Sequence, residues 1–524
     1  MDFLVHHMLR ASTAKYPARE ALVHSEQRLT YVEVSRQVFG LATALRNAGV
    51  QRGERVGIYL DAGIAQVVSI FAVSQAGAVF VPINGVLFPD QVEHIARDCG
   101  ISALITSAGK LESLNKALPN IPSLRFLVII SKTEHPATSL PTFDFAEMTK
   151  TPQEASWQDW GIEKDLAAIL YTSGSTGKPK GVMLSHANIM AGATIVSNYL
   201  GITCSDRVLA VLPFSFDAGL NQLMTAFQQG GTLVLINFVF ARQIVELLVK
   251  ERITGLAGVP TVWSLLAQTN STLQKNSLSE LRYITNTGGA MPQSVLKVLR
   301  AALPSTQIFL MYGLTEAFRS TYLPPVELDR RPTSMGKAIP DTEILVLNEQ
   351  SQVCTPGEVG ELVHRGPTVS LGYWGNPEAT GRVLKPNPLL PAEIGDTERV
   401  CYSGDLVKTD EDGFLYYVGR RDTMIKSSGF RVSPTEVEEM VFQSGKARHA
   451  AAIGIPDDLL GQAIKVFVVS RDGELFDKDA LLAFCTENMP RYMVPKFIEV
   501  MDELPKTSSG KVDYPSLRRR EGLA

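Results

Sequence analysis

Short apolar segments alternate with longer segments of helical apolar spacing through the first two-thirds of the chain. Arg55–Leu60 and Ala78–Ile83 have the composition of strands, and Ile64–Gln75 between them repeats apolar residues at helical spacing. The alternation returns at Leu166–Thr172 and continues to Gln307–Met311. Short runs that are apolar on both faces are typical of parallel strands covered by helices on both sides. The sequence therefore predicts an α/β fold with mostly parallel sheets flanked by helices.

The pattern changes after about residue 340. Segments such as Glu343–Leu347 are strand-like and are punctuated by Gly, Pro and Asp, which predicts a β-rich subdomain over about residues 341–420. Within it, Leu384–Glu398 is rich in proline and polar residues. We expect that stretch to be a surface loop, because loops run over the surface and tolerate such composition.

A third pattern occupies the last hundred residues. Ser433 is followed by Pro434 and Glu436, which is the order of an N-cap, a first helical residue and a capping-box partner. Apolar strand-like and helical segments then follow one another to the end of the chain. We expect a large N-terminal domain over residues 1–420 and a small α+β domain over residues 423–524.

Composition excludes several classes of protein. The 524 residues include 50 Lys and Arg and 54 Asp and Glu, so the net charge of −4 does not favour a nucleic-acid binder. The five cysteines are scattered without a Cys-x-x-Cys pair, which is not a disulfide framework. We find no signal peptide and no run of about 18 apolar residues, so we expect a cytoplasmic protein without a membrane span.

A loop rich in Ser, Thr, Gly and Lys follows the strand that ends at Thr172. Glycines permit backbone conformations in which successive N–H groups surround an anion, and the lysines add positive charge. The loop is not a Walker A motif, because only two residues separate its glycines. A flexible linker is the alternative, but linkers rarely follow a strand of buried character. The predicted phosphate-binding residues are Thr172, Ser173, Gly174, Ser175, Thr176, Gly177, Lys178 and Lys180.

The segment Tyr171–Gly181 resembles the signature of the adenylate-forming ligases, the superfamily of acyl-CoA synthetases, non-ribosomal peptide adenylation domains and luciferases. Further motifs occur in the superfamily's order across residues 20–515. The N-terminus and Tyr312–Pro324 are most similar to bacterial acyl-CoA ligases associated with exosortase systems. The resemblance implies a large adenylate-forming domain followed by a small, mobile C-terminal domain.

The resemblance also implies the nucleotide site. Tyr312 stacks on adenine, Thr315 contacts the α-phosphate of ATP and Glu316 binds Mg²⁺, which suits a hard cation's preference for oxygen ligands. A glycine-rich loop after the predicted strand at Tyr283–Thr287 borders adenine through Gly288, Gly289 and Ala290.

Two motifs near the end of the β-rich region complete the predicted nucleotide contacts. In Tyr402-Ser-Gly-Asp405, the aspartate binds the ribose hydroxyls, although Ser403 replaces the superfamily's threonine and Tyr402 replaces a common Arg or His. The resemblance places Arg420 near the ribose or the phosphates. The predicted catalytic residues are Lys511, Thr315, Glu316 and Arg420.

The remaining implied residues belong to the small domain. Asp422 is the hinge, and Gly429 lines the tunnel for the pantetheine thiol. Lys511 aligns with the catalytic lysine, whose ammonium group bridges the substrate carboxylate and the α-phosphate. A basic C-terminal tail is normally only solvated, but the Gly-Lys context favours the catalytic interpretation.

The resemblance places seven residues around the acyl pocket: Phe216, Asp217, Asn221, Asn286, Met311, Arg319 and Ser320. Phe216 is the expected aromatic gate, and Asp217 stands where amino-acid-activating members bind the substrate amine. Asp217 and Arg319 suit a zwitterion or a second polar group, or they form a structural salt bridge; the sequence favours neither. The polar lining predicts a small polar or amino-substituted acid instead of a long-chain fatty acid.

The sequence therefore predicts ATP-dependent activation of a carboxylic acid to an acyl-adenylate, with release of pyrophosphate, then transfer to the thiol of CoA. The alternative acceptors are an amine or the phosphopantetheine of a separate acyl carrier protein. A non-catalytic nucleotide-binding protein on the same fold is the alternative from another class. His186, just after the loop, is interpreted as a structural residue at a helix start.

Overall fold

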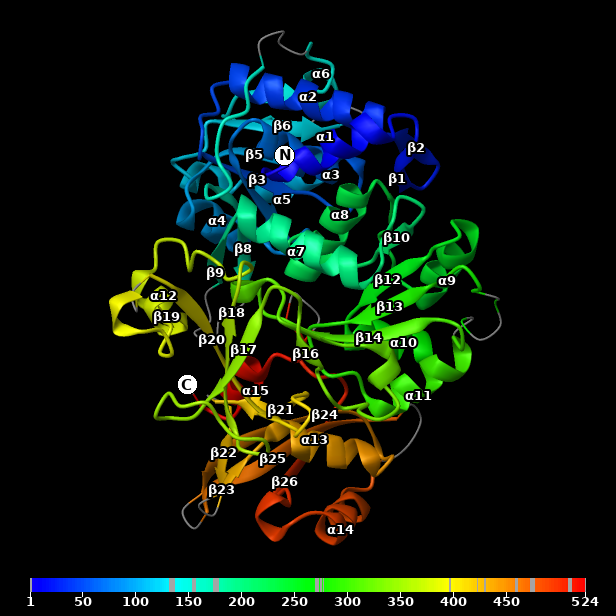
Figure 1. The fold of residues 1–524 in the computed structure, drawn as a ribbon, viewed down its shortest axis with the longest axis vertical. Helices are drawn as coiled ribbons and strands as arrows, with labels where there is room; N and C mark the ends of the chain where they lie inside the picture. The colour runs from blue at the N-terminus through cyan, green and yellow to red at the C-terminus, as the bar shows by residue number, and fades with distance from the viewer. Residues whose placement is uncertain are drawn as a thin grey trace.

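Four β-sheets and the helices packed on them make up the fold, seen in a computed structural model (Figure 1). The structure describes residues 2–131, 137–152, 157–172, 179–268, 273, 276, 278–394, 397–421, 423–427, 430–457, 460–471, 476–507 and 511–523. Among the described residues, no helix is both long enough and apolar enough to cross a membrane.

The first sheet confirms the predicted parallel arrangement. Its strands follow the order β7 (Thr142–Asp144), β6 (Phe126–Ile130), β5 (Ile101–Ser107), β3 (Arg55–Tyr59), β4 (Val79–Ile83), β8 (Leu166–Thr172) and β9 (Lys180–Ser185). All neighbours are parallel except β8 and β9, which are antiparallel. The strands β8 and β9 lie on either side of the predicted phosphate loop, so that loop leaves and re-enters the sheet at its edge.

The second sheet has nine strands and is parallel through its centre. Their order is β16 (Lys337–Ala338), β15 (Thr321–Leu323), β14 (Gln307–Tyr312), β13 (Tyr283–Asn286), β12 (Gly255–Gly258), β10 (Arg207–Ala210), β11 (Thr232–Leu235), β1 (Glu20–His24) and β2 (Gln27–Thr30). Only the edge pairs β1–β2, β14–β15 and β15–β16 are antiparallel. The loops that follow β13 and β14 therefore leave the same edge of the sheet.

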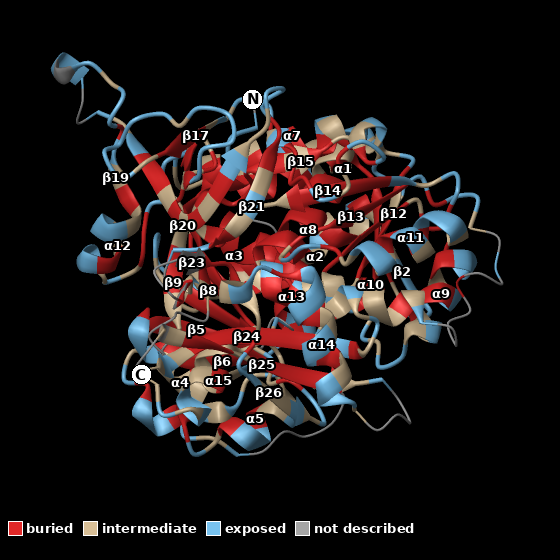
Figure 2. Cartoon of the chain, turned by 90° about the horizontal axis from the view of Figure 1, so that it is seen from below, coloured by how far each residue is buried: buried red, intermediate tan, exposed pale blue. Residues whose placement is uncertain are grey.

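A layer of helices between these two sheets forms one apolar core with both of them. The layer contains α1 (Val5–Lys15), α2 (Tyr31–Asn47), α3 (Ile64–Gln75), α7 (His186–Tyr199) and α8 (Asp217–Gln229). Helices α3 and α8 are buried on almost every face, because sheet strands and neighbouring helices enclose each of them. Figure 2 shows α8 and the central strands in red, whereas the outer helix α11 is largely pale blue.

Other helices cover the outer faces of the two sheets. On the first sheet these are α4 (Pro89–Asp98) and α5 (Ala108–Leu114), and α6 (Phe145–Met148) packs beside α2. On the second sheet they are α9 (Ala241–Lys250), α10 (Pro260–Ala267) and α11 (Gln293–Ala302). Short 3₁₀ helices occur at Leu118–Asn120, Thr315–Ala317, Pro325–Glu327, Ala392–Ile394 and Arg491–Met493.

The third sheet is antiparallel and corresponds to the predicted β-rich region. It contains β17 (Glu343–Leu347), β18 (Gly360–Arg365), β20 (Arg399–Thr409), β19 (Leu384–Pro386) and β21 (Leu415–Arg420), with α12 (Pro377–Val383) before β19. The prediction of a loop over Leu384–Glu398 is wrong at its start. Leu384 is buried opposite Cys401, and β19 tolerates Pro386 because it is an edge strand.

The fourth sheet belongs to the C-terminal part and lies at the opposite end of the molecule from α1 and α2 (Figure 1). It contains β23 (Phe430–Val432), β22 (Ile425–Ser427), β25 (Gly461–Ser470), β24 (Ala447–Asp457) and β26 (Phe497–Met501). Its helices are α13 (Pro434–Gln443), α14 (Lys478–Asn488) and α15 (Tyr514–Arg520). The Ser433 hydroxyl accepts a hydrogen bond from the Glu436 N–H, which confirms the predicted cap.

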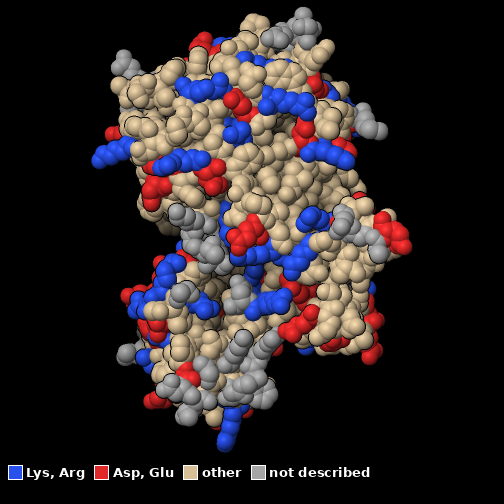
Figure 3. Space-filling view, turned by 90° about the vertical axis from the view of Figure 1, so that its left-hand side faces the viewer, with Lys and Arg blue, Asp and Glu red and all other residues tan. Residues whose placement is uncertain are grey.

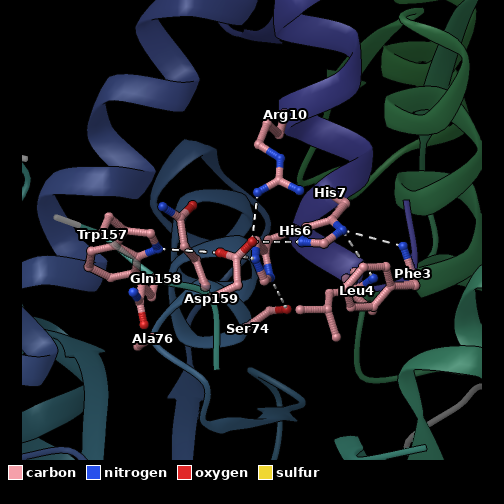
Figure 4. A network of polar contacts seen from close by, with 12 residues as sticks. Phe3, Leu4, His6, His7, Arg10, Ser74, Ala76, Trp157, Gln158 and Asp159 are labelled. Carbon is pink, nitrogen blue, oxygen red and sulfur yellow. Dashed lines mark hydrogen bonds and ion pairs between the residues drawn. The ribbon is translucent and has the colours of Figure 1, made fainter. Parts of the chain in front are cut away.

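A buried polar network anchors α1 to the rest of the molecule (Figure 4). The Asp159 carboxylate accepts hydrogen bonds from His6 Nε2, His7 Nε2 and Arg10 Nη1 at 3.1, 3.0 and 2.6 Å. His7 Nδ1 accepts from the Leu4 N–H, so its own proton is on Nε2 and points at Asp159. Although the His6, His7 and Asp159 ligand atoms lie within 4.8 Å of one another, N–H donors occupy the carboxylate. The cluster is therefore a structural anchor.

A third buried histidine holds the same helix. His186 accepts a hydrogen bond at Nδ1 from the Val5 N–H at 3.1 Å, and only 4% of the residue is exposed. This geometry agrees with the interpretation of His186 as a structural residue. It also means that the neutral forms of His7 and His186 are the ones that fit the folded protein.

We expect acid to destabilise the fold through these histidines. Burial lowers the pKa of His7 to about 4 and that of His186 to about 3, whereas an unfolded imidazole titrates near 6.5. The unfolded chain therefore takes up protons first, and stability falls as the pH drops below about 6.5 towards 4. For His7 the full shift corresponds to at most about 3 kcal/mol. Thermal unfolding of the wild type and of His7→Gln between pH 7 and 4.5 tests this. Equal pH slopes in the two proteins would contradict it.

Candidate active site

The predicted site residues gather where strands of the two parallel sheets end. Tyr312 ends β14, Asn286 ends β13 and Thr172 ends β8, and ligands of α/β folds bind at such carboxyl ends. Thr172 pairs with Lys180 across the base of the phosphate loop. Residues 173–178, the loop itself, lie outside the described residues, so their predicted phosphate contacts stay predictions.

Tyr312 and Asp405 meet at the predicted nucleotide position. The Tyr312 hydroxyl donates a hydrogen bond to Asp405 Oδ2, and Arg420 Nη1 lies 3.4 Å from Asp405 Oδ1. Asp405 and Arg420 are paired neighbours on β20 and β21, which brings the third sheet to the end of β14. Burial and the Asp405 carboxylate raise the pKa of Tyr312, so the phenol stays a donor.

Ser403 takes the place of the superfamily's threonine without disturbing Asp405. Its hydroxyl donates to the Leu362 carbonyl at 2.7 Å and accepts from the Asp405 N–H at 3.0 Å. Gly404 between them has a φ of +73°, and a Cβ there would lie 3.0 Å from Arg420 Nη2. The short polar side chain and the glycine therefore hold the Asp405 carboxylate towards Tyr312.

Glu316 lies in the 3₁₀ helix at Thr315–Ala317, next to the nucleotide position. Its Oε1 accepts a hydrogen bond of 2.5 Å from the Tyr373 hydroxyl. Lys180 Nζ lies 5.5 Å from the centre of the Tyr373 ring, so a lysine from the base of the phosphate loop flanks the same pair. The hydrogen bond engages one carboxylate oxygen of Glu316, and a carboxylate oxygen is the kind of ligand that Mg²⁺ prefers.

Lys511 reaches this region from the C-terminal part on a hairpin. Lys506 and Val512 pair across the hairpin, and Thr507 N–H donates to the Lys511 carbonyl at 2.7 Å. The ammonium group lies 5.9 Å from the centre of the Phe216 ring. A Cβ on Gly288, whose φ is +78°, would lie 3.4 Å from Lys511 Cε. The predicted catalytic lysine, gate and adenine loop are therefore neighbours.

A small cavity lies between α7, α8 and strands β12 to β14. It offers about 30 Å³ to water-sized molecules. Val196, Leu200 and Met311 give it an apolar side, and Asn221, Gln222 and Arg319 give it a polar side. Three of the seven predicted pocket residues, Asn221, Met311 and Arg319, line this cavity.

Several buried polar atoms at the cavity have no hydrogen-bond partner among the described residues. They are Asn221 Nδ2, Gln222 Oε1, Arg319 Nε and, beside the adenine loop, Asn286 Oδ1. Buried polar atoms are normally paired, so a group of unpaired atoms beside one cavity is a candidate for contact with a ligand. Arg319 Nη1 lies 3.4 Å from Asp217 Oδ2, a loose salt bridge between two buried groups that leaves Nε available.

Ser320 lies outside the cavity lining and contacts the third sheet. Its hydroxyl is hydrogen-bonded at 3.0 Å to Nδ1 of His364, a buried residue of β18, and it does not line the cavity. His364 Nε2 is bonded to Thr368, whose hydroxyl donates to the Arg319 carbonyl at 3.2 Å. Sequence reasoning missed His364 and Tyr373, because both reach the site from segments without a recognised motif.

Phe318 separates Glu316 from Arg319 by an unusual backbone turn. It has a φ of +49°, which a bulky residue adopts only when its surroundings enforce it. Its buried ring packs against Gly192 of α7, where a Cβ would lie 2.5 Å from the ring. The turn sends Glu316 towards Tyr373 and Arg319 into the acyl cavity. Asp422 and Gly429 lie outside the described residues, so their roles stay predictions.

Comparisons with known proteins agree with this geometry. A family model described as AMP-binding enzyme matches residues 9–374, and one described as AMP-binding enzyme C-terminal domain matches residues 436–511. The chain belongs to the AMP-binding enzyme family. It is 33% identical to a feruloyl-CoA synthase of Amycolatopsis sp over 97% of this chain and 96% of the relative. It is also 30% identical to a long-chain-fatty-acid–CoA ligase of Escherichia coli O157:H7, over 98% of this chain and 93% of the relative.

A solved anthranilate CoA ligase in complex with anthranoyl-AMP has the same fold. The TM-score is 0.89 at 27% identity, covering 100% of this chain and 98% of the other. This AMP-binding enzyme is thus an AMP-forming ligase, with ATP and CoA as its co-substrates. It activates a carboxylic acid as the acyl-adenylate and passes the acyl group to CoA. The relatives' names describe very different acids, so the acid must be argued from this chain's own cavity.

Replacement of Gly192 by alanine is expected to damage both the fold and the site. Alanine in a helix is normally more stable than glycine by about 1 kcal/mol, but here the Cβ meets the Phe318 ring. Such overpacking costs about 1–3 kcal/mol and shifts the turn that places Glu316 and Arg319. Urea unfolding and pyrophosphate release measure the two effects. Gly381→Ala in α12, where a Cβ meets nothing within 4 Å, is the matched control and should not be destabilised. Unchanged stability and activity in Gly192→Ala would contradict this account.

Proposed function

We propose that this ligase activates a compact carboxylic acid that carries a polar substituent, such as an amino, hydroxyl or second carboxyl group. The observation that carries the proposal is the small cavity between α7, α8 and the second sheet, where buried donors and acceptors have no partner among the described residues. Asn221 Nδ2 and Arg319 Nε are donors, and Gln222 Oε1 is an acceptor. A substrate that pairs them removes the penalty of about 1–3 kcal/mol for each unsatisfied buried group.

The far side of the cavity argues against a long acyl chain. Met311 belongs to an aromatic cluster in which Tyr199 and Tyr322 stack with ring centres 4.2 Å apart. The Tyr199 hydroxyl contacts the Met311 sulfur at 3.6 Å. These buried side chains close the cavity behind Met311, and we propose that they keep the acyl pocket short.

The site residues have distinct roles in adenylation. A carboxylate oxygen attacks the α-phosphate of ATP, the new O–P bond forms, and the bond to pyrophosphate breaks. This step needs in-line positioning and neutralisation of charge more than proton transfer. Lys511 supplies a cation between the carboxylate and the α-phosphate, and Thr315 donates to a phosphate oxygen. Tyr312 carries adenine, and Asp405 with Arg420 orients the ribose. Mg²⁺, held by Glu316, would neutralise phosphate charge when bound.

The surface around this site suits two polyanionic substrates. Although the net charge of the chain is −4, Lys and Arg side chains gather across the middle of one face, between the large sheets and the C-terminal part (Figure 3). We propose that residues 423–524 rotate about Asp422 after adenylation, so that Gly429 replaces Lys511 for the thiol step. The experiment below also distinguishes CoA from the alternative acceptors, which are a carrier-protein thiol and an amine.

Acid-dependent pyrophosphate release with Mg–ATP, with and without CoA, tests the substrate class. The panel contains amino- and hydroxybenzoates, hydroxycinnamates, short dicarboxylates, α-amino acids and palmitate, with products identified by mass. We expect saturable release with at least one compact polar acid and formation of its CoA thioester. Activation of palmitate with no polar acid active would overturn the proposal. If the adenylate forms but no CoA thioester is produced, the acceptor would instead be a carrier protein or an amine.

Replacement of Lys511 by alanine should slow adenylation by about 10²–10³-fold, because a charge contact made mainly in the transition state is lost. Conversion of a supplied acyl-adenylate to the CoA thioester should change little. Lys506→Ala on the same hairpin, whose partner is the exposed Glu503, is the control. Equal adenylation rates in Lys511→Ala and Lys506→Ala would remove Lys511 from the mechanism.

A further inference from the structure

The segment 370–374 connects the base of the phosphate loop to the predicted metal ligand. The Met183 N–H donates to the Gly372 carbonyl at 2.8 Å, and the Trp374 N–H donates to the Gly181 carbonyl at 2.8 Å. Val182 and Tyr373 form an antiparallel bridge. The segment therefore extends the first sheet by pairing with β9, the strand that leaves the phosphate loop.

The same segment holds Glu316 at two points. The Ser370 N–H donates to the Glu316 carbonyl at 2.8 Å, which fixes its backbone. The Tyr373 hydroxyl donates to Glu316 Oε1 at 2.5 Å, which fixes its carboxylate. The Tyr373 ring is 9% exposed, and Lys180 Nζ lies 5.5 Å from its centre. One tyrosine thus contacts both a phosphate-loop lysine and the predicted metal ligand.

A hydrogen bond at this place has a specific consequence for a metal site. The terminal torsion of a glutamate is broad, so a carboxylate on a one-turn 3₁₀ helix rotates unless something holds it. A bond to Oε1 fixes the rotation and leaves the lone pairs of Oε2 for another partner.

We propose that Tyr373 is a positioning residue for the metal: its phenol orients the Glu316 carboxylate and ties that orientation to the phosphate loop through β9 and Lys180. The inference rests on the proposed role of Glu316 as the Mg²⁺ ligand. Loss of an outer hydrogen bond to a metal ligand typically weakens metal binding by about 10–100-fold. Tyr373 acts through Glu316 and need not touch the metal or the phosphates.

The test is Tyr373→Phe, which keeps the ring and removes only the hydroxyl. Mn²⁺ binding in the presence of a non-hydrolysable ATP analogue, followed by electron paramagnetic resonance, reports the metal site without turnover. The Mg²⁺ concentration for half-maximal pyrophosphate release reports it during turnover. In Tyr373→Phe we expect the dissociation constant for Mn²⁺ and the Mg²⁺ concentration for half-maximal release each to rise by about 10-fold. The melting temperature should not change. Tyr416→Phe removes a phenol that bonds a different carboxylate, Asp410, and should shift neither.

Glu316→Gln separates failure of this inference from failure of the proposed metal ligand. If Glu316→Gln leaves the metal dependence unchanged, Glu316 is not the ligand and the proposed role falls first. If Glu316→Gln changes the metal dependence and Tyr373→Phe does not, only the inference about Tyr373 is overturned. If Tyr373 acts through Glu316, the double variant should be no weaker than Glu316→Gln alone, whereas additive shifts would show that the phenol acts independently.

Discussion

The helices buried between the two parallel sheets are the constraint on which the site depends. Helices α3 and α8 expose almost nothing, and their side chains belong to one apolar core together with strands of both sheets. A shared core fixes the two sheets relative to each other. The ends of β8, β13 and β14 therefore keep fixed positions relative to one another, although the predicted phosphate loop leaves one sheet and the predicted adenine loop and Tyr312 belong to the other.

Two of the contacts that join the later parts of the chain to this frame at the site are polar or charged. Asp405 from the third sheet accepts from Tyr312, and Lys511 from the fourth lies beside Phe216 and Gly288. The third sheet also shares an apolar cluster with Tyr312, whereas Lys511 reaches the site as a charged side chain on a hairpin. A flexible lysine on a hairpin can withdraw at little cost in buried area, which suits a site that needs it for one step only.

The sequence alone predicts the regular elements well and their long-range contacts poorly. Strands β8 and β17 and helix α3 have the predicted bounds, because apolar periodicity is a local signal. Strand β19 was missed because its partner Cys401 is 17 residues away and its own composition is that of a loop. Tyr373 and His364 were missed for the same reason: each reaches the site through a partner at least 44 residues away. The resemblance supplied Lys511, which no local pattern identifies.

The turn at Phe318 links acid recognition to the nucleotide. Glu316 and Arg319 are three residues apart, and the left-handed backbone between them sends one to Tyr373 and the other into the acyl cavity. Gly192 and His364 hold this turn from two sides, through the Phe318 ring and through Ser320. The residues proposed for acid binding and for metal binding are therefore positioned by one turn of four residues, and any change that moves the Phe318 ring is expected to move both.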